Sequence, residues 1–335
     1  MDGEGKAMHK SLGNAVSPDD VIKDYGADML RLWVASADYT QDMRISPEIL
    51  KQLSQAYLKI RNTARYMLGN LDGFDPNSPM APKDMVELDR WAVAQFNQLA
   101  KNVRSAYDRY EFHAAYRAIY NFCVVEMSNF YLDIIKDRLY CGDQAARLSA
   151  QSALYTILDG MTRLIAPILA FTSDEIWAAM PHAAGDNAES VVLNDMPAYD
   201  SALALSEAEE DKWAKVIALR DDVNKALELA RTEQGIKKNQ DADLTLTFTA
   251  DGWKTFQAMA LTEAELATLC IVSAVKVAEG AGEGFQGESF EGLTVKVDPA
   301  AGAKCPRCWN HDVHIGTDGH HAELCDRCAH VVENA

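Results

Sequence analysis

The chain has 335 residues, of which 48% are hydrophobic, and a formal net charge of −18 at pH 7. This length and apolar content predict two or three folded domains. The acidic balance excludes a protein that coats nucleic acid with its whole surface, but it is compatible with a local basic face. No secretory signal is visible, and Glu126 and Asp133 interrupt the most apolar stretch. We therefore expect no membrane segment.

Helical patterns dominate the first 180 residues. Ser17-Pro18 and Ser46-Pro47 each combine a capping side chain with a first-turn proline. Further helical patterns lie at 84–110, 111–140, 144–166 and 173–180, and the pattern at 111–140 is apolar nearly all round, which is typical of a buried helix. The sequence predicts an antiparallel helix bundle at 43–185, preceded at 1–42 by a loop and a connecting helix.

The pattern changes after about residue 181. Ser206 and Glu209 form a predicted capping box that opens a polar helix to about residue 234. "ADLTLTFTA" at 242–250 alternates with the period of a half-buried strand, and "LCIVSAVKVAEG" and "LTVKVD" are further strand candidates. The expected fold is mainly α, with the bundle followed at 186–300 by this helix and a small α+β domain.

Four cysteines close the chain in two Cys-x2-Cys pairs, Cys305 with Cys308 and Cys325 with Cys328, separated by 16 residues. This spacing is typical of one structural Zn²⁺, because four thiolates complete a tetrahedron and leave no open position for chemistry. Residues 301–335 are too few to fold alone, so metal binding, at about 10–16 kcal/mol in zinc-finger peptides, would stabilise this zinc module. The remaining cysteines are scattered, which indicates a reducing, cytoplasmic compartment rather than a disulfide framework.

Three alternatives remain for the C-terminal cysteines. Their spacing arises by chance, they pair as two disulfides, or a nearby histidine replaces one of them as a zinc ligand; the nearby histidines are His311, His314, His320, His321 and His330. The segment "HIGT" at 314–317 mimics the His-Ile-Gly-His signature of class I aminoacyl-tRNA synthetases. It lies inside the metal loop with no preceding strand and helix, so we interpret it as a coincidence.

"AMHKSLGN" at 7–14 resembles the second signature of class I aminoacyl-tRNA synthetases, Lys-Met-Ser-Lys-Ser followed by Leu/Ile-Gly-Asn. The continuation "VSPDDVIKDYGADMLRLWVASADYTQDMRIS" resembles the isoleucine, valine, leucine and methionine subgroup. Ala7 and His9 depart from the signature, whereas Met8, Lys10 and Ser11 match it. The resemblance implies that Lys10 neutralises the triphosphate of ATP, with Met8 and Ser11 completing the catalytic loop.

The resemblance extends through "ILKQLSQAYLKIRNTARYMLGNLDGFDP", "LDRWAV", "VEMSNFYLDIIKDRLY" and "LIAPILAFTSDEIW", which look like the anticodon-binding bundle of isoleucyl-tRNA synthetases. "KCPRCWN…LCDRC" favours the isoleucine branch. The resemblance implies that this chain is the C-terminal third of a monomeric enzyme, and that its partner is isoleucine tRNA. Upstream nucleotide-binding and editing domains of the same polypeptide would use ATP and Mg²⁺, and we expect this chain alone to be inactive.

Candidate tRNA contacts gather on the helix predicted at 49–71. Lys51, Lys59, Arg61 and Arg65 lie opposite its apolar arc, and residues 44–65 hold five basic residues and one acid. Such a local positive balance suits phosphates. Trp309, beside the second cysteine, is either a stacking platform for a base or a packing residue of the metal knuckle. The lesser candidates are Arg104, Arg138, Arg307 and Arg327.

Three other functions remain compatible with these patterns. The nearest is the same region of a valine or methionine enzyme. The second is a free-standing RNA-binding protein that reuses the bundle. The third is a zinc-ribbon module whose acidic surface binds another protein. Zinc-dependent affinity for RNA distinguishes the third from the others.

Overall fold

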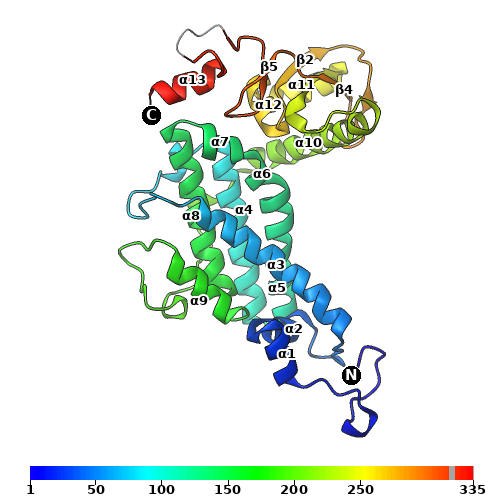
Figure 1. Cartoon of the computed structure of the whole chain (residues 1–335), viewed down its shortest axis with the longest axis vertical. Helices are drawn as coiled ribbons and strands as arrows, with labels where there is room; N and C mark the ends of the chain where they lie inside the picture. Colours follow the sequence, from blue (N-terminus) through cyan, green and yellow to red (C-terminus); the bar gives the residue numbers. More distant parts are fainter. Residues whose placement is uncertain (317–320, 335) are drawn as a thin grey trace. The chain divides into compact units, whose positions relative to one another are not determined.

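The computed structural model describes residues 1–316 and 321–334 and divides the chain into two units (Figure 1). Unit 1 comprises Met1–Asp133 and Ala145–Ala204, and unit 2 comprises Ile134–Gln144 and Leu205–Ala335. The four segments expected from the sequence are therefore regrouped. In particular, residues 134–144, which we assigned to the bundle, belong to the same unit as the zinc module.

Unit 1 is a helix bundle, as expected. Its α-helices are α1 (Pro18–Tyr25), α2 (Ala27–Ser36), α3 (Pro47–Gly69), α4 (Glu87–Asp108), α5 (Phe112–Asn121), α8 (Gln144–Ile165) and α9 (Ala170–Ala179), and α6 (Leu132–Ile134) lies at the boundary of the units. Short 3-10 turns are η1 (Lys10–Leu12), η2 (Pro82–Asp84), η4 (Val191–Leu193) and η5 (Ser201–Leu203). No helix in the described part of the chain is both long and apolar enough to cross a bilayer.

Local sequence signals explain where α3 begins and which face it buries. The Ser46 hydroxyl accepts a hydrogen bond from the Ile49 amide at 3.3 Å, and Pro47 occupies the first turn. The buried side includes Ile60, Ala64 and Met67, which lie on the apolar arc read from the sequence. The N-terminus of α1 is capped less well, because the Ser17 side chain makes no capping hydrogen bond there.

The pattern at 111–140 does not form one α-helix, so that prediction was wrong. Between α5 and α6 the chain forms a π-helix, η3 (Phe122–Tyr131), and α7 (Lys136–Cys141) follows as a separate short helix. The Ser128 hydroxyl donates to the Cys123 carbonyl, five residues earlier, at 2.7 Å. The Thr63 hydroxyl of α3 lies 3.1 Å from Ser128, so tertiary contacts support the wider turn.

Glu126 lies partly buried in η3, and its buried Oε2 atom has no hydrogen-bond partner. Burial raises the pKa of this carboxyl above its usual range. The native state therefore binds a proton more tightly than the unfolded state, and its stability falls as pH rises above the unfolded pKa. We expect Glu126→Gln to be more stable than the parent at pH 8, with the difference shrinking towards pH 4. Urea unfolding at both pH values checks this, and an equal difference at the two would contradict it.

Unit 2 combines a long helix with a small mixed sheet. Helix α10 (Glu207–Glu233) opens with the predicted capping box, since the Ser206 hydroxyl accepts from the Glu209 amide at 3.3 Å and the Glu209 carboxylate accepts from the Ser206 amide at 2.9 Å. The sheet strands are β1 (Ala242–Phe248), β2 (Ala274–Glu279), β3 (Phe285–Gln286) and β4 (Leu293–Pro299), in the order β2-β1-β4-β3. The helices α11 (Ala250–Ala258) and α12 (Glu263–Cys270) connect β1 to β2.

Strand β1 is the centre of this sheet. It pairs parallel with β2 and antiparallel with β4, so that Leu244 faces Val275 on one side and Val297 on the other. Its residues alternate between buried and half-buried, as its period-two sequence predicted. The Phe248 ring stacks on Phe256 of α11 with the centroids 4.8 Å apart, which fixes that helix on the sheet.

The Asp222 carboxylate ties α10 to the loop that precedes β4. It is fully buried, and both of its oxygens accept hydrogen bonds from the backbone amides of Glu288, Ser289 and Phe290 at 2.8–3.0 Å. Gly287 is needed beside it, because a Cβ there would lie 2.7 Å from an Asp222 oxygen. One buried charge thus organises this loop.

Candidate metal centre and nucleic-acid interface

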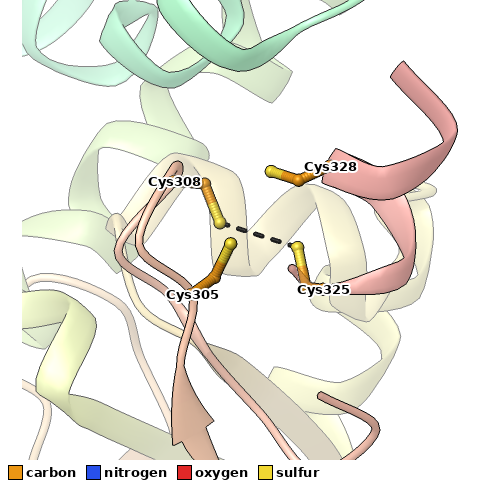
Figure 2. A group of neighbouring side chains, drawn as sticks. All are labelled: Cys305, Cys308, Cys325 and Cys328. Atoms are coloured by element: carbon orange, nitrogen blue, oxygen red, sulfur yellow. Dashed lines mark hydrogen bonds between the residues drawn. The ribbon is translucent and has the colours of Figure 1, made fainter. Parts of the chain in front are cut away.

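The four C-terminal cysteines converge on one point in unit 2. Cys305 and Cys308 belong to the turn between β5 (Ala303–Lys304) and β6 (His311–Asp312), and Cys325 and Cys328 lie at the start of α13 (Asp326–Glu333). All four are buried, and their sulfurs lie within 4.8 Å of one another (Figure 2). The Cys308 and Cys325 sulfurs are 3.7 Å apart. Tetrahedral Zn–S bonds of about 2.3 Å require about 3.8 Å between sulfurs, so the donor set fits zinc.

The protonation chemistry of the cysteines also fits a divalent cation. Burial acts to raise the pKa of Cys305, but backbone amides of Cys308, Cys325 and Arg307 donate to its sulfur and bring the pKa down to about 7. Burial raises the pKa of the Cys308 and Cys325 thiols, the latter to about 11. A cation at the centre offsets that cost, because thiolates are its ligands.

The metal group contains no histidine from the described residues. His311 instead lies at the sheet, where its ring is 3.4 Å from Asp241, and His314 contacts Asp312 at 3.2 Å. All seven described cysteines are free thiols, so the two-disulfide alternative is absent from this structure. His320 and the end of the "HIGT" segment lie outside the described residues.

Polar contacts fasten the β5–β6 ribbon to the small sheet. The Lys304 ammonium lies 2.5 Å from an oxygen of Asp241, and this contact is the largest cause that holds the pKa of Asp241 below its usual range. The His311 amide donates to the Ser273 hydroxyl at 2.7 Å. These two contacts therefore connect the metal turn to residues 63 and 38 positions earlier in the chain.

Trp309 is exposed and does not pack beneath the knuckle. Its side chain is 51% exposed, and the Lys238 ammonium lies 4.6 Å from the ring centroid. The Trp309 backbone has φ +68°, a conformation that favours glycine, and its amide donates to the Cys305 carbonyl at 2.9 Å. The geometry fits a base platform with a cation beside it. Lys238 was missed from the sequence, where only its position in the basic pair Lys237-Lys238 was visible.

The predicted basic face of α3 is only partly available. Lys51, Lys59 and Arg65 are exposed. Arg61 is engaged inside unit 1, because its guanidinium donates to both oxygens of Glu175 on α9 at 2.7 and 2.8 Å. This pairing is the largest cause of the raised pKa of Arg61. Of the four cations predicted on this face, the other three are exposed.

The lesser arginine candidates lie elsewhere. Arg104 is exposed on α4, with a long contact of 3.5 Å to the Pro197 carbonyl. Arg138 lies half-buried in α7. Arg307 donates to the Cys141 carbonyl at 2.7 Å, and Arg327 pairs with Asp137, which is the largest cause of the raised pKa of Arg327. The last two guanidiniums have partners within unit 2.

The loop at residues 7–14 is held by Asn14. Its side chain accepts from the His9 amide at 2.9 Å and donates to the Asp2 carboxylate at 2.8 Å. Met8 packs against a small buried cluster of Val21 in α1, Ile45, and Leu50 in α3, whereas Lys10 and Ser11 are exposed. The loop therefore presents the Lys10 ammonium to solvent while Met8 anchors it. The nearby Lys6 pairs with Glu4 at 2.8 Å.

Three protein families match consecutive parts of the chain. Residues 1–46 match class I tRNA synthetases (I, L, M and V), residues 89–246 match the anticodon-binding domain of tRNA ligase, and residues 302–331 match the zinc finger found in FPG and IleRS. The third match coincides with the four-cysteine group, which assigns that group to a known zinc-binding family.

Several curated relatives align over 99% of the chain. They include proteins described as isoleucine–tRNA ligases from Syntrophotalea carbinolica, at 50% identity, Geobacter sulfurreducens, at 47%, and Caldanaerobacter subterraneus, at 45%. The chain spans 36% of the length of each of them. These relatives favour the isoleucine branch over the valine and methionine alternatives.

Proposed function

Because the chain belongs to the isoleucine–tRNA ligase family, we propose that it supplies the tRNA-binding part of such a ligase and binds the anticodon stem-loop of isoleucine tRNA. The observation that carries this proposal is the exposed Trp309 ring beside the metal turn, with the Lys238 ammonium next to it. Bases of an RNA loop are unstacked and stack readily on such rings. Zinc has a structural part in this function, since it holds the turn that presents Trp309.

Phosphate contacts are proposed for the exposed cations of α3. Lys51, Lys59 and Arg65 project from one helix in a chain of net charge −18, so they form a local site for a polyanion. Arg61, held by Glu175, would orient α3 and α9 rather than contact RNA. Arg104 and Arg138 remain secondary proposals, and Arg307 and Arg327 have structural contacts that account for them without RNA.

The catalytic activity is proposed for the longer protein only. ATP and Mg²⁺ would be used there, with Lys10 stabilising the triphosphate and Met8 and Ser11 shaping the loop. The chain spans 36% of its relatives and is proposed to contribute recognition without chemistry of its own. Aminoacylation by the pure chain would contradict this. We further propose a monomer in the cytoplasm, where seven free thiols remain reduced.

Anticodon preference tests the proposal. The zinc-loaded chain is titrated with isoleucine tRNA and with the same tRNA carrying a changed anticodon, at a fixed salt concentration near about 0.15 M, because phosphate contacts make affinity depend on salt. Tighter binding of the native anticodon is the expected result. Binding without preference would point to a general RNA-binding protein. No binding to either RNA would favour a protein partner for the zinc module.

Trp309→Gly is expected to separate RNA affinity from stability. Glycine accepts the left-handed backbone at this position, so the zinc module should remain as stable as before or become slightly more stable. Loss of the ring should weaken tRNA binding about 5- to 150-fold, the equivalent of one lost base stack of about 1–3 kcal/mol. Val313→Ala, which trims another exposed apolar side chain of the module, is the control. Unchanged affinity in Trp309→Gly would remove Trp309 from the interface.

A further inference from the structure

Arg307 connects the metal cysteines to α7, a helix far away in the sequence. One nitrogen of its guanidinium lies 2.7 Å from the Cys141 carbonyl and 3.7 Å from the Cys328 sulfur. The Cys141 thiol in turn donates to the Arg307 carbonyl at 3.3 Å. Cys141 is itself buried in one cluster with the four metal cysteines. Residues 166 positions apart thus form a reciprocal pair at the edge of the metal group.

Arg327 makes the corresponding connection from the second cysteine pair. Its guanidinium forms a bidentate ion pair with Asp137 of α7, with a distance of 2.8 Å between Nη2 and Oδ1. The Cys308 side chain is a further cause, smaller than Asp137, that raises the pKa of Arg327. Each Cys-x2-Cys pair therefore contains one arginine that is held by a group on α7, Arg307 by the Cys141 carbonyl and Arg327 by Asp137.

Electrostatics explains why cations are needed at these positions. A zinc ion with four thiolates carries a net charge of about −2, and the four cysteines are at most 7% exposed. A buried charge without compensation is strongly unfavourable. Guanidinium is always charged and its planar fork holds a fixed direction, so it suits this position if another group orients it. Groups that orient or neutralise metal ligands typically change metal affinity 10- to 100-fold.

We propose that α7 is part of the zinc site. Asp137 and the Cys141 carbonyl position Arg327 and Arg307, and the two guanidiniums neutralise the zinc-bound thiolates. Zinc retention therefore depends on a helix that lies between two helices of the bundle in the sequence. This assignment stands on contacts inside unit 2 and does not depend on whether the chain binds tRNA.

The direction in which Asp137→Asn changes the rate of zinc release distinguishes two roles for Asp137. It either positions Arg327 or acts only through its own negative charge. If only net charge mattered, removing an acid near a negatively charged centre would hold zinc more tightly. If Asp137 positions Arg327, Asp137→Asn should instead release zinc faster, because the guanidinium loses its bidentate partner. Asp137 is not a member of the four-cysteine group found among the described residues, so its effect on zinc is expected to pass through Arg327.

Zinc transfer to an excess of a colorimetric chelator, measured with the full zinc-loaded chain, tests the proposal. We expect about 10-fold faster release in Asp137→Asn and in Arg327→Met, and a similar effect in Arg307→Met. The double variant Asp137→Asn with Arg327→Met should be no faster than Arg327→Met alone. Asp137→Glu should restore slow release in part. Arg231→Met, which removes an arginine that bonds Asn239 in the same unit, is the matched control.

Cobalt substitution keeps the outcome interpretable. The absorption bands of tetrahedral thiolate-bound Co²⁺ report whether a variant still assembles the four-sulfur site. Intact bands with faster zinc release support the proposal. Release within twofold of Arg231→Met, or slower release in Asp137→Asn, overturns it. If Arg327→Met fails to load metal, Asp137→Asn, whose altered side chain is 27% exposed, decides the question through the direction of its effect.

Discussion

Cys308→Ser is expected to remove zinc and unfold the ribbon and α13 together. The cysteine sulfurs meet at one point, and the segment from residue 301 has too little core of its own to remain folded without the metal. In comparable zinc peptides, the free energy of zinc binding, which stabilises the fold, is about 10–16 kcal/mol. A segment of this length has no other source of that much stability. Metal content by mass spectrometry should fall from one zinc per chain to well below one. Amide hydrogen exchange in β5, β6 and α13 should become fast.

The same experiment separates the zinc module from the rest of unit 2. Exchange in β1 and β4 should change little, because their pairing does not involve the cysteines. Cys270→Ala is the control, since Cys270 is a buried thiol of the same unit outside the metal group. It should lose some packing energy but keep its zinc. A Cys308→Ser protein that retains one zinc and a protected α13 would show that a different ligand set operates.

Asp222→Asn is expected to destabilise unit 2 by about 3–6 kcal/mol. The carboxylate accepts four hydrogen bonds from backbone amides, and an amide side chain keeps only one of the two acceptor oxygens. The new NH2 group would face amide donors, so at least two bonds to a charged group, each worth about 1.5–3 kcal/mol, are lost. Thermal unfolding of the unit and hydrogen exchange at residues 288–290 measure the effect.

Asp221→Asn provides the matched control for this prediction. Asp221 is the neighbour of Asp222 on α10 but is exposed, so the same chemical change should alter stability by no more than about 0.5 kcal/mol. Equal effects of the two substitutions would show that helix charge, and not the buried contact with the loop, is responsible. Retained protection of the Phe290 amide in Asp222→Asn would also contradict the expected mechanism.

Several features that depend only on neighbouring residues were predictable from the sequence. The capping box of Ser206 and Glu209, the N-cap at Ser46 and the alternation of β1 all appear as expected, because each is decided within a few residues. The four-cysteine group was predictable because its spacing carries the geometry of its metal. The resemblance of residues 7–14 and of the bundle to isoleucyl-tRNA synthetases led to the family that the relatives now support.

The π-helix is a feature that the local sequence did not predict. An apolar run predicts burial, but it does not decide whether backbone hydrogen bonds connect residues four or five positions apart. Contacts of Ser128 with Thr63 and Cys123 support the wider turn, and Thr63 lies 65 residues away. The grouping of residues 134–144 with unit 2 was equally inaccessible, because the partners of α7 follow it by more than 160 residues.

The sequence by itself indicated most of the helices and strands, the four-cysteine group and the resemblance to isoleucyl-tRNA synthetases, since these are encoded in periodicity, caps and short spacings. Only the tertiary structure decided which of the candidate basic side chains are engaged with partners within the protein. Arg61 forms an ion pair with Glu175, 114 residues away, and Arg327 forms one with Asp137, 190 residues away. The Lys238 ammonium lies over the Trp309 ring. The physical reason is that a charge pairs with whatever the fold places within a few ångströms, and a linear pattern carries no such distances.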